Sequence, residues 1–198
     1  MQDEFAAEDF GVVAIALDEH VDVVRPLTEN ITFPVLIDRE HLITELLAIS
    51  NVPTVLWVDE QGRIARPNAT EFGSNTFTEF TGVDAEEHKD LVRAWVREGA
   101  VPVAPAEAAT AVDDLDDDEL AARLYYRIAL HLQRAGDDEG ASRNFDTAVA
   151  LAPLDFTISR ASLPLRGGNP FGEEFFELYN AWKDAGSPFH GYGRELRG

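Results

Sequence analysis

Apolar runs and amphipathic stretches alternate along the first half of the chain. Residues Val12–Leu17 are apolar without a polar interruption, which is typical of a strand buried on both faces of a parallel sheet. A second extended piece is predicted at Phe33–Asp38, and a third at Val55–Val58, which Asp59–Gly62 closes as a hairpin turn. Apolar residues at helical spacing predict helices over residues 2–10, 21–30, 41–50 and 84–99. Together these elements predict an α/β domain over residues 1–99.

Helical periodicity dominates the second half of the chain. Residues 100–118 are rich in Pro, Ala and Asp and are interpreted as a linker between two domains. From Glu119, apolar residues recur at every fourth position up to a turn at Gly136, and a second helix is predicted over residues 138–152. Residues 119–198 are therefore predicted to form a small all-α domain.

The segment Val52-Pro53-Thr54 precedes the third strand, and the hairpin after it ends in Gly62-Arg63-Ile64. This order, after a strand ending in Asp18 and the Phe-Pro-Val-Leu-Ile-Asp piece, resembles thioredoxin-like proteins of the TlpA/ResA type in the redoxin (AhpC/TSA) superfamily. The resemblance implies a thioredoxin-like sheet flanked by helices. It also implies that the first strand and the start of the Cys-x-x-Cys helix would lie upstream of Met1. The activity it implies is dithiol–disulfide exchange.

The chain has no cysteine, so that activity has no nucleophile here. No catalytic, metal-binding or cofactor-binding residue is assigned, and the chain as given is predicted to be redox-inactive. The resemblance leaves one implied site, a cis-proline loop in which Val52, Pro53 and Thr54 offer backbone groups to an extended peptide. A trans proline that only opens a strand is the alternative. Because the nucleophile is absent, the alternative to an oxidoreductase is a non-catalytic protein-binding module that uses the cis-proline loop and the helical domain.

The two predicted helices after the linker resemble a single tetratricopeptide repeat. Its small and aromatic positions are matched by residues in both helices and by the proline that follows them: Ala129, Ala141, Phe145, Ala148 and Pro153. The resemblance implies a second protein-binding surface. One such repeat does not bury a continuous core by itself, so it is expected to pack on another part of the protein.

Charge narrows the set of partners. There are 37 Asp and Glu residues against 16 Lys and Arg, which gives a formal net charge of −21. Such a surface repels nucleic acid and anionic membranes, so neither is expected as a partner. No membrane segment is expected, and the chain as given is taken as cytoplasmic, although the resembled proteins are often anchored outside the cytoplasm. A homodimer that covers exposed sheet positions is a further expectation.

Three polar motifs were weighed as sites. The carboxylates and imidazole of Asp18–Asp22 could form a metal site, but a solvated loop with a helix cap is favoured. Asp113–Glu119 lacks the spacing of a calcium loop and is interpreted as linker and helix start. Arg166–Asn169 could hold an anion through backbone N–H groups, although a structural turn is favoured.

Overall fold

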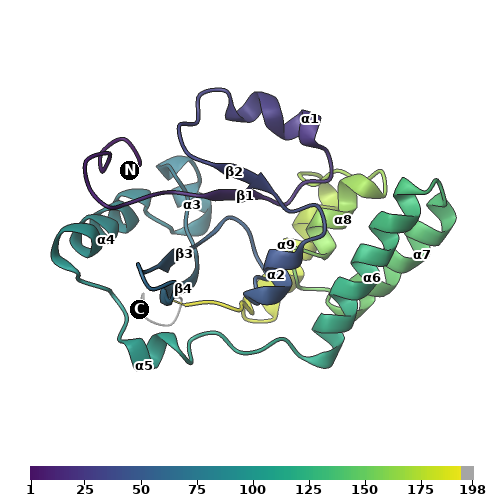
Figure 1. Ribbon diagram of the computed structural model, residues 1–198. Coiled ribbons are helices and arrows are strands. Elements are labelled where there is room, and N and C mark those ends of the chain that lie inside the picture. The colour runs from purple at the N-terminus through teal and green to yellow at the C-terminus, as the bar shows by residue number, and fades with distance from the viewer. Residues whose placement is uncertain (193–198) are drawn as a thin grey trace. The chain divides into compact units, whose positions relative to one another are not determined.

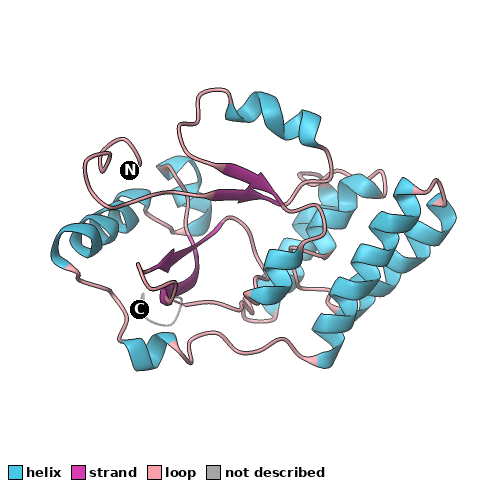
Figure 2. Ribbon diagram, in the orientation of Figure 1, coloured by secondary structure: helices cyan, strands magenta, loops and turns pink. Residues whose placement is uncertain are grey.

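The computed structural model describes residues 1–192, apart from the side chain at position 80 (Figure 1). The chain divides into two units, and each is built from more than one stretch of sequence. The first unit comprises Met1–Arg39, Pro53–Val112 and Gly191–Gly198, and the second comprises Glu40–Val52 and Asp113–His190. All the assigned strands (Figure 2) belong to the first unit, and the longest helix, α6, belongs to the second.

The strands of the first unit form two separate two-stranded sheets. Strands β1 (Ala14–Ala16) and β2 (Val35–Ile37) are parallel, with Ile15 opposite Leu36. Strands β3 (Thr54–Val58) and β4 (Ile64–Thr70) form an antiparallel hairpin whose register shifts around Trp57. The mixed α/β class is therefore confirmed, and so is the predicted hairpin.

Asp59 and Gly62 determine the hairpin turn. The carboxylate of Asp59 accepts hydrogen bonds from the backbone N–H groups of Gln61 and Arg63 at 3.0 and 2.9 Å. These hydrogen bonds hold the pKa of Asp59 below its ordinary value, and the bond from the Arg63 backbone has the largest effect. Gly62 has a φ of 76°, a left-handed conformation that glycine adopts without a Cβ penalty. The hydrogen bonds of Asp59 and the left-handed conformation of Gly62 thus stabilise the turn.

Short helices connect the strands of the first unit. Helix α1 (Val21–Val24) passes directly into the 3₁₀ helix η1 (Arg25–Thr28), because Pro26 lacks the N–H that would continue an α-helix. Helix α4 (Ala85–Glu98) starts at Asp84, whose carboxylate accepts the Glu86 backbone N–H at 2.9 Å. The same carboxylate also accepts a hydrogen bond from the Asn75 side-chain amide at 3.1 Å. The other helices are η2 (Asn75–Phe77), α3 (Thr78–Thr81) and α5 (Pro105–Ala108).

The predicted helix over residues 2–10 is wrong, since this segment forms consecutive turns. The stretch is too short to offset the cost of helix nucleation. Its apolar residues still pack inward. Phe5 is fully buried and joins Trp57 and Val92 in the core of the first unit. Trp57 stacks on Trp95 with ring centroids 4.9 Å apart, so aromatic packing holds the hairpin against α4.

Helices form the whole of the second unit. A short helix, α2 (Leu42–Leu46), is followed much later in the chain by the long pair α6 (Asp117–Arg134) and α7 (Asp138–Leu151). Figure 1 shows α6 and α7 lying side by side, joined by a short turn at Gly136. Helices α8 (Ser159–Leu165) and α9 (Glu173–Asp184) complete the unit.

The core of the second unit lies between α6, α7 and α8. Four of the five residues matched to a tetratricopeptide repeat are buried there, since Ala129, Ala141, Phe145 and Ala148 are at most 2% exposed, whereas Pro153 is exposed. Tyr126 packs edge-on against Phe145, with centroids 5.4 Å apart. These four residues therefore face inward, whereas Leu120, Leu124 and Ile128, which recur at every fourth position of α6, are 38–54% exposed.

Candidate functional site

The loop predicted from the resemblance, Val52–Thr54, is where the chain passes in sequence from the second unit to the first. Val52 is half-buried and ends the Glu40–Val52 segment of the second unit, while the exposed Pro53 begins a segment of the first. Thr54 opens β3, and its Oγ1 donates a hydrogen bond to the Ala69 carbonyl at 3.1 Å. The role of these three residues in peptide binding, and the cis form of Pro53, stay predictions.

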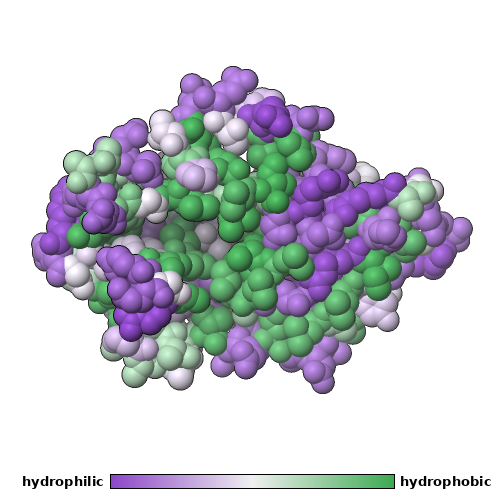
Figure 3. Space-filling view, in the orientation of Figure 1, coloured by the Kyte–Doolittle hydropathy of each residue, from purple (hydrophilic) through white to green (hydrophobic). Residues whose placement is uncertain are grey.

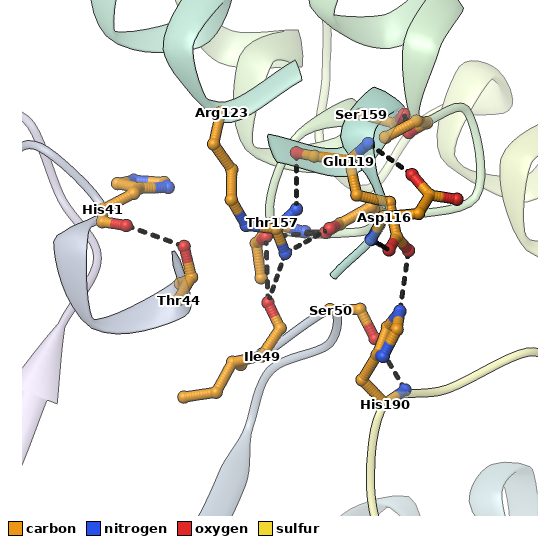
Figure 4. Close-up of polar contacts among 12 residues, drawn as sticks. His41, Thr44, Ile49, Ser50, Asp116, Glu119, Arg123, Thr157, Ser159 and His190 are labelled. Atoms are coloured by element: carbon orange, nitrogen blue, oxygen red, sulfur yellow. Dashed lines mark hydrogen bonds and ion pairs between the residues drawn. The ribbon is translucent and has the colours of Figure 1, made fainter. Parts of the chain in front are cut away.

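The backbone leading into this loop is held by buried polar contacts within the second unit (Figure 4). The carbonyl oxygen of Ile49 accepts hydrogen bonds from Arg123 Nη2 at 3.1 Å and from Thr157 Oγ1 at 3.3 Å. The carbonyl of Ser50 accepts the Phe156 backbone N–H at 2.9 Å. Two consecutive peptide groups are thus fixed by residues more than 70 positions later in the chain.

At the centre of this network is a buried ion pair. Arg123 Nη2 lies 2.7 Å from Asp155 Oδ2, and the two side chains are 1% and 4% exposed. Arg123 also donates to the Glu119 carbonyl at 3.1 Å, while Asp155 Oδ1 accepts the N–H and the hydroxyl of Thr157 at 2.8 and 2.6 Å. Burial raises the pKa of Asp155, and the charge of Arg123 and the Thr157 hydrogen bonds oppose that rise.

His190 adds a second connection to the same segment. Its backbone N–H donates to Ser50 Oγ at 3.1 Å, and its ring Nε2 lies 2.7 Å from Glu119 Oε1. Glu119 is already fixed, because it forms a reciprocal capping box with Asp116 at the start of α6. His190 is therefore tied to a rigid helix terminus.

Serine, histidine and a carboxylate come together here without forming a nucleophilic triad. In a triad, a ring nitrogen of histidine accepts the serine hydroxyl proton. In this chain both ring nitrogens lie elsewhere, near Glu119 Oε1 and the Asp113 carbonyl, and Ser50 is contacted by the main chain of His190. Ser50 is also only 7% exposed. The arrangement holds a backbone segment in place.

The first unit has a buried polar cluster of its own, beside the core tryptophan. Arg66 and Glu71 form an ion pair, and each residue is 2% exposed. The Arg66 guanidinium lies over the Trp57 ring, 5.2 Å from its centroid, and Trp57 Nε1–H donates to His88 Nε2 at 3.4 Å. His88 Nδ1 is 3.9 Å from Glu71 Oε2. These contacts connect β4 to α4 through charge and ring stacking.

None of the three polar motifs considered in the sequence forms a metal or anion site in the described residues. No group of three or more His, Cys, Asp or Glu residues suited to a metal ion occurs among the described residues, Asp18–Asp22 included. The amide N–H groups of Gly167 and Gly168 donate to the Pro164 and Leu163 carbonyls, so they are not available to hold an anion. Asp116, within the acidic run, caps α6.

Sequence reasoning missed Arg123, Asp155 and His190. Each contacts a residue at least 32 positions away, so no local spacing marks it. The one available signal is that Arg123 lies beside Ala122 and Tyr126 on the inward face of α6, where an arginine needs an acidic partner.

The part of the chain that the structure describes contains no helix long and apolar enough to cross a membrane. Comparisons of the chain with protein-family models, with curated proteins and with solved structures find no match.

Proposed function

We propose that this chain is a non-catalytic protein-binding module on a thioredoxin-like scaffold, and that it takes up an extended peptide segment along strand β1. The observation that carries the proposal is the unpaired edge of β1. Among the described strands, β1 pairs with β2 alone. The absence of cysteine from the sequence supports a binding role over dithiol–disulfide exchange.

The hydrogen bonds between β1 and β2 define which edge is open. Ala14 N–H donates to the Pro34 carbonyl at 3.0 Å, and Asp38 N–H donates to the Ala16 carbonyl at 2.9 Å. Alternate residues of a strand direct their peptide groups to opposite sides. The N–H and C=O groups of Ile15 therefore point away from β2, toward the edge where an added strand would pair.

Exposed apolar side chains accompany this edge. Val13, Ile15 and Leu36 are 59%, 41% and 54% exposed. Ile15 lies opposite Leu36, and Val13 is two residues before Ile15, so all three share one face of the two-stranded sheet. Parallel sheets normally bury both faces, and two strands alone are marginally stable in water. A bound peptide segment would pair with the open edge of β1 as a third strand. It would also cover the exposed apolar side chains of this face.

The resemblance supports the same interpretation from the sequence side. It implies one larger thioredoxin-like sheet, whereas the described strands form two sheets of two. It also implies peptide contact at Val52–Thr54, which offers a second place for the same extended partner. Because the chain carries a net charge of −21, the partner segment is expected to combine apolar residues with lysine or arginine.

A peptide library displayed on phage would test the proposal against the immobilised full chain. We expect enrichment of extended sequences with alternating apolar residues and at least one basic residue. The variant Ile15→Asp should lose these peptides, because it places a charge on the open edge. The matched control is Leu27→Asp, which changes a 75% exposed residue of η1 and should bind normally. Failure to enrich any peptide, or equal binding by Ile15→Asp, would refute the proposal.

A further inference from the structure

An apolar stripe runs along the solvent side of α6. Leu120, Leu124 and Ile128 are 38%, 54% and 46% exposed, and they follow one another at four-residue spacing. Residues four apart lie on the same face of a helix, so these three side chains form one continuous row, the α6 stripe. It lies outside the β1 edge of the proposed function and within the second unit alone.

Helix α2 widens this surface. Leu42 and Leu46 are 51% and 75% exposed. The helix is fastened to α6 by Glu45 Oε2, 2.5 Å from Arg127 Nη2, and by the His41 ring, which lies 4.7 Å from the Tyr126 ring. Figure 3 shows green, hydrophobic surface over α2 and over the N-terminal half of α6. Contiguous apolar surface of this kind marks an interaction site.

The exposed apolar residues of the α6 stripe are placed symmetrically about Leu124, and an acidic residue and a histidine lie at equal distances on either side of it. Asp117 and His131 lie seven residues before and after Leu124, and Leu120 and Ile128 lie four before and after it. Asp117 and His131 are both exposed and lie on the same side of the helix as the stripe. In an antiparallel pair of α6 helices, Leu124 would meet Leu124, Leu120 would meet Ile128, and Asp117 would meet the imidazole of His131.

We propose that the α6 stripe binds a second copy of this chain, with the two α6 helices antiparallel about a two-fold axis at Leu124. A two-fold interface requires a surface that complements itself, and this sequence of apolar and charged positions does so. A basic partner segment would find no oppositely charged residue at the end of the stripe where His131 lies. Asp117 at one end of the stripe and His131 at the other favour the antiparallel order, because only that order brings the carboxylate and the imidazole together.

Molar mass measured by light scattering across a concentration series would test the proposal with the full chain. Ionic strength should be about 0.15 M, where exposed charges more than about 8 Å apart are largely screened, because each copy is strongly acidic. We expect a monomer–dimer equilibrium. Leu124→Glu should weaken dimerisation about a hundredfold, since a two-fold interface loses two leucine contacts and gains two facing carboxylates.

Phe176→Glu is the matched control, because Phe176 is 51% exposed on α9 of the same unit. It should dimerise like the unmodified chain. A chain that stays monomeric up to its solubility limit would overturn the proposal. So would a dimer that Leu124→Glu leaves unchanged. Peptide binding at β1 is measured separately, so either result leaves the proposed function open to its own test.

Single cysteines would determine the orientation, since the chain has no native cysteine. With a short bis-maleimide linker, Leu124→Cys should be cross-linked into dimers, because the two sites face each other at the axis. Asp117→Cys should not, because antiparallel helices place those two positions about 21 Å apart along the axis at 1.5 Å per residue. Equal cross-linking at both positions would indicate a parallel pair and refute the antiparallel arrangement.

Discussion

Removal of the Arg123 side chain tests whether the buried network holds the second unit together. Arg123→Met keeps most of the aliphatic volume but removes the guanidinium, and with it the contact to Asp155 at 2.7 Å and the hydrogen bonds to the Ile49 and Glu119 carbonyls. The Ile49 carbonyl keeps its bond from Thr157, so the main loss is the counter-ion of a carboxylate that is 4% exposed.

The expected loss is large. Breaking a buried ion pair from one side costs about 3–5 kcal/mol, because the remaining charge stays desolvated and unpaired. With a urea m-value of about 2 kcal/mol/M, this lowers the unfolding midpoint by about 2 M. Circular dichroism at 222 nm follows the transition, since the second unit is built from helices.

Arg143→Met is the matched control on α7. Arg143 pairs with Glu139 at 2.9 Å, but the two side chains are 65% and 90% exposed. Such surface pairs contribute about 0–1 kcal/mol, so the control should unfold close to the unmodified chain. If Arg123→Met loses no more stability than Arg143→Met, the buried pair does not support the unit and the reasoning is refuted.

The free energy of unfolding lost in Arg123→Met should become smaller as pH falls. Burial raises the pKa of Asp155, and without Arg123 the carboxyl should titrate higher still. A folded-state pKa above the unfolded value means that the folded form gains stability as pH falls. The difference between the variant and the unmodified chain should therefore narrow toward acid pH. A difference that is constant or grows on acidification would contradict a buried carboxylate as the cause.

Three further outcomes are expected. Phe145→Ala should destabilise the second unit by about 3–5 kcal/mol in urea unfolding, because the ring is 1% exposed, whereas Phe176→Ala on α9 should have a small effect. Hydrogen bonds from the Glu86 N–H and from Asn75 lower the pKa of Asp84, so its contribution to α4 is complete above the ordinary aspartate pKa and is lost as pH falls through the lowered one. A carboxyl ¹³C titration should show that lowered midpoint and would contradict the cap if it did not. An insulin-reduction assay with dithiothreitol should show no turnover above background, and measurable turnover would refute the redox-inactive assignment.

Local patterns in the sequence predicted the elements whose structure depends on near neighbours. The hairpin follows from an apolar run, a polar turn and Gly62, and helices α6 and α7 follow from apolar residues at helical spacing. Periodicity did not identify the buried face of α6, because Leu120, Leu124 and Ile128 are 38–54% exposed, whereas Ala129 and Phe145, matched to the repeat, are buried.

Contacts between distant residues could not be predicted. Thr157 and Ile49 are 108 positions apart, and no local spacing joins a threonine hydroxyl to that carbonyl. The helix predicted over residues 41–50 ends at Leu46, and Ala48 then adopts a φ of 48°, which turns the chain toward Arg123 and Thr157. An alanine in that conformation is disfavoured locally. The contacts made by Ile49 and Ser50 offset that local preference, and they lie far along the chain.

The assignment of Glu40–Val52 to the second unit has a consequence for how the protein can be divided. The unit that contains α6 and α7 also needs this segment from the first quarter of the chain, which it binds through Arg123, Phe156 and His190. A fragment starting at the linker would lack Glu40–Val52 and would leave the Arg123–Asp155 pair open to water. The helical part of the chain is therefore not expected to fold by itself. A gene fusion that carried residues 119–198 alone would lack the Glu40–Val52 segment of the second unit.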